Sequence, residues 1–182
     1  MAKGWRAATN IPIGALVLML VLASASYGDL KEDQVKAAYL YQISKFVFWP
    51  PSLDETQTFT VCQLGPDSYS GNLSKLNGRS VADKPIKVIQ ISSLDQVTNC
   101  QLLILSEPER VSAKELEGKL KQTPILTVVD GQQNHQKGMV VFVIEDQRVR
   151  LHINLNLAKQ ARLTFAANLL EVATHIYRGS EG

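Results

Sequence analysis

Residues 101–105, Gln-Leu-Leu-Ile-Leu, place four aliphatic residues in a row, a pattern typical of a strand that is buried on both faces. Strand-like segments rich in apolar residues and bordered by Gly or Pro recur at 59–64, 86–91 and 124–129. Helical segments separate them, at 68–76, 92–95 and 112–121. In the last of these, Ser112 and Glu115 have the spacing of a capping box. This alternation predicts an α/β fold, a three-layer α/β/α domain with a largely parallel sheet.

Residues 33–49 precede the first strand and carry an apolar stripe at helical spacing, formed by Val35, Tyr39, Leu40, Ile43, Phe46 and Val47. Asp33 is either the N-cap or a first-turn acid that complements the helix dipole. Pro50 and Pro51 end the predicted helix, because Pro50 disfavours the α conformation at Trp49 and has no N–H to donate.

The end of this helix presents several aromatic residues together. They either pack into the core over the sheet, or leave Phe48 or Trp49 exposed as an anchor for a partner protein. The candidate partner-binding residues are therefore Lys45, Phe46, Phe48 and Trp49.

The pattern changes after residue 138. Residues 139–144 are uniformly apolar, 145–148 form a predicted tight turn, and 149–155 alternate strictly, which predicts a C-terminal antiparallel hairpin. Asn154 or Asn156 is expected to cap a short helix after it. A final helix is predicted over 164–177.

Three polar residues of the second hairpin strand share one face, which alternation predicts to be wet. Arg150, His152 and Asn154 are candidate ligand-binding residues, since an arginine can hold a carboxylate or phosphate by two hydrogen bonds. The alternative is a solvated edge strand whose charge prevents pairing with another sheet. The polar loop 130–138, at the carboxyl end of a predicted parallel strand, is either a binding loop or a mobile connection.

Residues 1–28 have the pattern of a signal peptide. Lys3 and Arg6 form the positive start, residues 11–23 the apolar run, and Ala25 or Gly28 ends a candidate cleavage site. An uncleaved signal anchor is the alternative. The expected mature chain is a single domain over 29–178, with a frayed tail at 179–182.

If the chain is exported, its two cysteines are expected to form a disulfide, because an oxidising compartment favours this bond. Cys62 and Cys100 are the only pair available, and the predicted bridge brings the first and third strands close together. Two buried free thiols or a redox-active pair are the alternatives.

Charge and motifs exclude several classes of function. The chain has 19 Lys and Arg against 17 Asp and Glu, and Lys3 and Arg6 lie in the leader, which leaves 17 of each sign. A neutral domain is a poor candidate for binding nucleic acid or an anionic membrane. No phosphate-binding, metal-binding or nucleophile motif occurs, so no catalytic residue, metal ligand or cofactor is predicted, and the protein is not expected to be an enzyme.

The mature chain resembles the YfiR family of exported regulators. The resemblance is carried by Val35-Lys-Ala-Ala-Tyr-Leu40, Lys45-Phe46, Trp49-Pro50, Leu126-Thr-Val, Gly138-Met139, Phe142-Val-Ile-Glu-Asp146, Val149-Arg150, Ile153-Asn154-Leu155, Leu169-Leu170 and Ala173. Phe48 stands where family members often carry an acid, Gln147 where glycine is common, and the chain has one cysteine pair where some relatives have two.

The resemblance implies a periplasmic homodimer that binds the periplasmic sensor domain of an inner-membrane diguanylate cyclase and represses it. Cyclic-di-GMP output and biofilm formation would then fall. The alternative function is a periplasmic module that binds a small anionic ligand through Arg150 and His152. An envelope thiol-disulfide enzyme is a more remote third hypothesis.

Overall fold

A computed structural model describes residues 31–53 and 55–179. The predicted signal peptide, residues 1–28, lies outside these residues, as do residues 180–182 of the predicted tail. Within the described part, every helix is too short or too polar to cross a bilayer.

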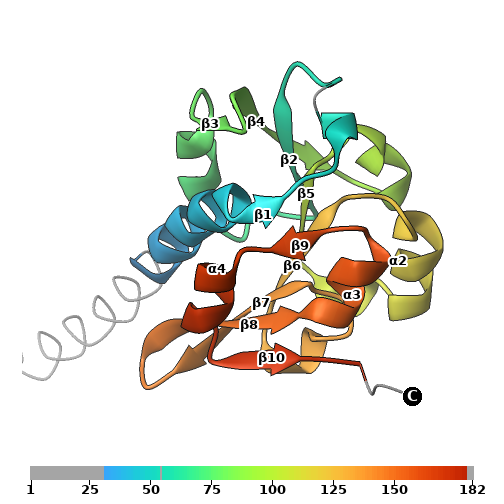
Figure 1. Cartoon of the computed structure of the whole chain (residues 1–182). Helices are drawn as coiled ribbons and strands as arrows, with labels where there is room; N and C mark the ends of the chain where they lie inside the picture. The colour runs from blue at the N-terminus through green and yellow to red at the C-terminus, as the bar shows by residue number, and fades with distance from the viewer. Residues whose placement is uncertain (1–30, 54, 180–182) are drawn as a thin grey trace, which may run out of the picture.

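The core of the fold is an eight-stranded sheet with the order β10-β8-β7-β6-β5-β2-β4-β3 (Figure 1). Its strands are β2 (Phe59–Leu64), β3 (Ser80–Val81), β4 (Lys84–Ile91), β5 (Leu102–Leu105), β6 (Leu126–Asp130), β7 (Val140–Glu145), β8 (Arg148–Asn154) and β10 (His175–Tyr177). The five strands β4, β2, β5, β6 and β7 are parallel, and β8 returns antiparallel to β7 as the predicted hairpin. The predicted fold class, α/β with a mostly parallel sheet, is confirmed.

Each face of the sheet has its own core. Leu102 and Ile104 of β5 belong to one core and Leu103 and Leu105 to the other, because side chains alternate across a strand. The first core is covered by the N-terminal helix (described over residues 31–45), η2 (Asn72–Leu76), α3 (Leu155–Gln160) and α4 (Ala167–Val172). The second is covered by η3 (Leu94–Asn99) and α2 (Ala113–Leu120).

Two helix N-caps predicted from the sequence are found in the structure. The hydroxyl of Ser112 accepts a hydrogen bond of 3.1 Å from the backbone N–H of Glu115 at the start of α2. At the start of α3, the side-chain oxygen of Asn154 accepts from the backbone N–H of Leu157, also at 3.1 Å. Both predicted caps are therefore present, with Asn154 rather than Asn156 in the second.

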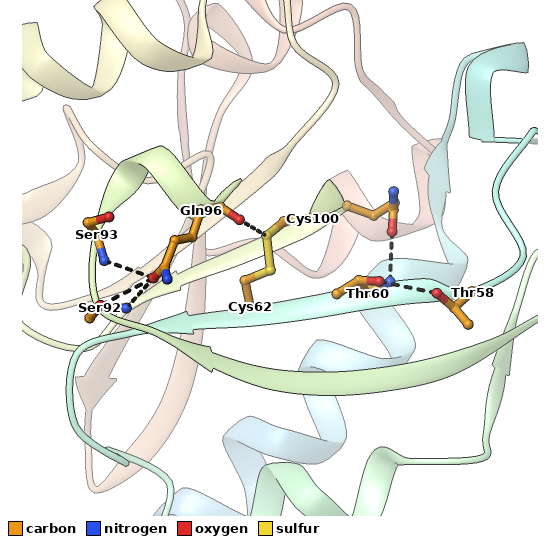
Figure 2. Close-up of a disulfide and its surroundings, with 8 residues drawn as sticks. Thr58, Thr60, Cys62, Ser92, Ser93, Gln96 and Cys100 are labelled. Atoms are coloured by element: carbon orange, nitrogen blue, oxygen red, sulfur yellow. Dashed lines mark hydrogen bonds between the residues drawn. A yellow bond between two sulfur atoms is a disulfide. The ribbon is translucent and has the colours of Figure 1, made fainter. Parts of the chain in front are cut away.

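The predicted disulfide joins Cys62 of β2 to Cys100, just before β5, with Cα atoms 5.8 Å apart (Figure 2). Both residues are almost fully buried. Gln96, in the turn η3 beside the bridge, accepts hydrogen bonds from the backbone N–H groups of Ser92 and Ser93. The bridge thus fixes the entry of β5 beside β2 and lies in the apolar core, a setting that fits a structural role.

The predicted final helix over 164–177 is wrong. Three elements occupy this segment: β9 (Thr164–Phe165), the short helix α4, and β10, which pairs with β8 in parallel. The residues from Thr174 to Tyr177 include β-branched and aromatic types that favour a strand. The strand forms here because it can pair with the open edge of β8. This long-range contact cannot be predicted from helical periodicity within the segment.

The N-terminal helix ends before the predicted position. Its helical residues stop at 45, and Val47–Phe48 form β1, which pairs antiparallel with β9 (Figure 1). Residues 31 and 32 are helical, so Asp33 is not the N-cap; its carboxylate instead accepts a hydrogen bond of 2.6 Å from the hydroxyl of Ser70. The predicted helix at 68–76 is reduced to the 3-10 turn η2.

Candidate partner-binding site

An apolar groove runs between the N-terminal helix and α4, with β8 as its floor. It encloses about 490 Å³ and is lined by Tyr39, Gln42, Ile43, Phe46, Val149, Arg150, Leu151, Asn168, Leu169 and Val172. We call this the helix–α4 groove. Its two walls, the N-terminal helix and α4, are far apart in the sequence. The pairing of β1 with β9 brings these two segments together.

Large apolar side chains in this groove are exposed. Tyr39, Phe46 and Val172 are 42%, 38% and 67% exposed, whereas Ile43 and Leu169 are buried beneath them. A clustered apolar surface of this kind marks a site of protein association more often than scattered exposed residues do. The groove therefore has the character of a docking surface.

A second hollow of about 730 Å³ adjoins the groove and shares Tyr39, Val149 and Arg150 with it. Ile144, half exposed, adds another apolar side chain there. Cations border this hollow at Lys31, Arg148 and Arg150, none of which has an ion-pair partner among the described residues. An apolar stripe with a basic border is complementary to an apolar surface that carries acidic residues.

The helix that forms one wall is anchored by a buried ammonium group. Lys36 lies 2.6 Å from Glu32 and 3.0 Å from Asp130 at the carboxyl end of β6. Burial lowers the pKa of Lys36, but the hydrogen bond to Glu32 and the charge of Asp130 outweigh it and leave the pKa raised. Lys36 thus stays charged and holds the helix against the sheet.

Asp130 is the member of this cluster whose charge is least well compensated. Burial raises the pKa of its carboxyl above the ordinary value, and the Lys36 ammonium offsets this only in part. Its Oδ1 is the one buried side-chain nitrogen or oxygen atom in the described residues without a hydrogen-bond partner. Burial, and then the nearby Asp130 charge, also raises the pKa of Tyr69 well above its ordinary value.

The predicted partner-binding residues separate into two groups. Phe46 lines the groove, and Phe48 is 63% exposed on β1. Trp49 instead packs edge-on against Phe59 with ring centroids 5.0 Å apart, and its Nε1 donates to the carbonyl of Ser44. Lys45 lies over the ring of Tyr41 at 5.4 Å from its centroid.

The face of β8 that carries Arg150, His152 and Asn154 was expected to be wet, and this expectation is wrong. His152 and Asn154 are 3% and 7% exposed, because β10 pairs along β8 and removes its free edge. Their side chains are used internally: His152 contacts Glu145, and Asn154 donates to the carbonyl of His135. Arg150 remains partly exposed, so the structure separates the three candidate ligand residues.

Sequence reasoning missed most of the groove. Helical spacing assigns Tyr39 to the apolar stripe of the first helix, and Val172 lies in the predicted helix 164–177, which does not exist in that form. The available signal was the number of large apolar residues in the first helix, of which Tyr39 and Phe46 stay exposed. Across the described chain, His, Cys, Asp and Glu side chains form no group of three that is arranged to hold a metal ion.

The model of the YfiR/HmsC-like family matches residues 33–174 of this chain. The chain belongs to the YfiR/HmsC-like family. This confirms the resemblance found in the sequence, and it fits a periplasmic regulator of a diguanylate cyclase.

No curated protein matches this YfiR/HmsC-like chain. Among solved structures, it is similar to an ABC domain in complex with L-Trp from Streptococcus pneumonia, with 10% identity and a TM-score of 0.48. The match covers 80% of this chain and 60% of that structure.

Proposed function

We propose that this YfiR/HmsC-like protein is exported by a cleavable signal peptide over residues 1–28 and binds the periplasmic sensor domain of an inner-membrane diguanylate cyclase. Binding represses the cyclase and lowers cyclic-di-GMP output and biofilm formation. The family match supports the class of partner. The helix–α4 groove supports a mode of action by binding, since it offers clustered, exposed apolar side chains.

Repression follows from a difference in affinity. A regulator that binds the inactive conformation of the sensor more tightly than the active one shifts the cyclase toward the inactive state. A coupling of about 1–3 kcal/mol changes that equilibrium roughly 5- to 150-fold, which is sufficient for regulation. No covalent chemistry is needed, so the protein acts as a binding partner and not as an enzyme.

We also infer that the mature protein forms a homodimer and is not inserted in the membrane after signal cleavage. Family resemblance supports self-association. Sedimentation of the mature protein measures its oligomeric state, and a monomer at all concentrations would contradict the inference.

The decisive experiment measures binding of the mature protein to the sensor domain of a cyclase encoded beside it. Val172→Asp and Tyr39→Ala change exposed groove residues, so we expect each to weaken binding by about 1–3 kcal/mol, the range of an interface hot spot. Lys119→Met changes an exposed residue of α2, on the other face of the sheet, and is the control. Phe48→Ala tests whether the exposed Phe48 extends the binding surface beyond the groove. Cyclic-di-GMP levels in a deletion strain complemented with each variant should follow the measured affinities.

Two outcomes would overturn the proposal. One is unchanged affinity in both groove variants, with thermal stability equal to the parent protein. The other is a deletion strain whose cyclic-di-GMP level does not change.

A further inference from the structure

All three histidines of the chain gather at one edge of the sheet. His152 lies on β8, His175 on β10 and His135 in the loop after β6, and all three rings surround Tyr177. The ring of Tyr177 stacks on His135 with centroids 4.6 Å apart and meets His175 at 4.3 Å. Nothing in the spacing of these residues in the sequence predicts this cluster.

His152 is the buried member and has a partner for each ring nitrogen. Its Nε2 lies 3.1 Å from Oε1 of Glu145 on β7, and its Nδ1 lies 3.4 Å from the hydroxyl of Tyr177. A neutral imidazole satisfies both contacts, with Nε2–H donating to the carboxylate and Nδ1 accepting from the hydroxyl.

His175 is the direct cross-strand partner of His152 in the β8–β10 pair. The two ring centroids are 5.3 Å apart. Like charges directly opposite each other on neighbouring strands are destabilising. Protonation of both rings therefore opposes the pairing that holds β10 to the sheet.

The surroundings do not neutralise a second charge. The same face of β8 carries Arg148 and Arg150, and the cross-strand residues of β7 are Val141, Val143 and Glu145. The loop contributes His135, which adds a third proton acceptor. Of the groups that face the cluster from these elements, Glu145 is the single carboxylate. Among the described residues of these elements, a second positive charge in the cluster has no second carboxylate beside it.

β10 is also a short strand that directly follows α4, the helix that forms one wall of the groove. It pairs with β8 over only three residues and is the edge strand of the sheet that the described residues form. It follows α4 directly, with the backbone N–H of Thr174 donating to the carbonyl of Leu151 on the groove floor. Loosening β10 frees the C-terminal end of α4, which carries Val172.

We propose that the cluster of His135, His152 and His175 is a pH-sensitive latch that holds β10 to β8 at neutral pH and releases it on acidification. Histidine is the side chain whose charge changes between about pH 5 and 8, the range that an envelope protein meets. Release of β10 loosens α4, which forms one wall of the helix–α4 groove, and so weakens binding of a partner in that groove. Control of partner binding by this latch rests on the proposed function.

Hydrogen exchange of the mature protein tests the latch. Protection of β10 amides, taken relative to the β5 amides of the same sample, is measured at about pH 7.5 and about pH 5.5. We expect this protection to fall about two- to fivefold in the parent protein on acidification, the effect of one like-charge cross-strand pair. His175→Gln removes the second charge and should keep its protection.

Glu145→Gln provides a second variant in case His175→Gln alters the packing against Tyr177. It removes the carboxylate that balances the first charge, so release should occur at a higher pH than in the parent protein. Protection that does not change with pH in the parent protein, or changes equally in the parent and both variants, would overturn the latch.

Sensor-domain affinity, measured at the same two pH values, tests the link to regulation. Affinity should fall on acidification in the parent protein and not in His175→Gln. An affinity that is constant while β10 loosens would overturn the control of binding. Absence of binding at neutral pH would instead overturn the proposed function, and the exchange measurement would still decide the latch.

Discussion

The Nζ of Lys36 in the N-terminal helix lies 3.0 Å from Oδ2 of Asp130 at the carboxyl end of β6. Glu32, one helical turn earlier, shares the same ammonium group. This contact joins the helix that forms one wall of the groove to a central strand of the sheet. The position of Tyr39 and Phe46 therefore depends on an ion pair that lies outside the groove.

Replacing Lys36 with methionine keeps the apolar stem and removes the charge. We expect the free energy of unfolding to fall by about 1–2 kcal/mol, because Asp130 is left partly buried without its cation. Urea denaturation measures the change. Lys119→Met, which breaks the exposed pair with Asp95, is the control and should not alter stability measurably.

Asp130→Asn tests the raised pKa of this carboxyl. A folded-state pKa above the unfolded value means that the folded protein favours the protonated form, so stability is lost as the pH rises through the folded pKa. Asparagine does not titrate. The stability of Asp130→Asn relative to the parent protein should therefore increase between about pH 3 and about pH 6. A relative stability that decreases over this range would contradict the prediction.

Trp49 is predicted to stabilise the fold and not to anchor a partner. Trp49→Phe removes the hydrogen bond to the carbonyl of Ser44 and should cost about 1 kcal/mol of unfolding free energy. Trp49→Ala also removes the packing on Phe59 and should cost about 3 kcal/mol or more. Thermal unfolding checks both values. Phe48→Ala, at the neighbouring exposed position, should change stability little; equal losses at 48 and 49 would contradict this assignment.

The β7–β8 turn stores backbone strain in non-glycine residues. Asp146 and Gln147 have φ values of +49° and +59°, the left-handed conformation that glycine adopts most easily. Gln147→Gly should raise the free energy of unfolding by about 0.5–1 kcal/mol. Asp146→Gly should raise the free energy of unfolding by less than Gln147→Gly does, because aspartate tolerates this conformation better than glutamine. Chemical denaturation of the two variants side by side measures the difference.

The disulfide is predicted to be structural. The double variant Cys62→Ser/Cys100→Ser opens a loop with a sequence separation of 38 and should lower the free energy of unfolding by about 3–4 kcal/mol. If the variant still folds, it should bind the sensor domain as the parent protein does. Loss of binding in a fully folded variant would instead indicate a redox role.

The sequence predicts the sheet well because its signals are local. Strand β2 has the predicted bounds, and β5 reads as a buried run because both of its faces are covered. The disulfide follows from having one cysteine pair in an exported chain. Each of these conclusions depends on a few neighbouring residues and on general rules of packing.

The missed features depend on contacts between distant segments. Pairing of β1 with β9 shortens the first helix, and pairing of β10 with β8 replaces the end of the last helix and buries His152. The apolar periodicity of one segment does not show whether a distant strand has a free edge with which that segment could pair. The groove and the histidine cluster both arise from these two pairings, and for this reason sequence reasoning found neither.

The pairing of Val47–Phe48 with Thr164–Phe165 also has a consequence for biogenesis. A residue pair from opposite ends of the domain can form only after nearly the whole polypeptide has been delivered. A chain that lacks either segment therefore lacks both the small sheet and the groove. Under the proposed function, the binding surface is therefore complete only once both segments of the domain are present.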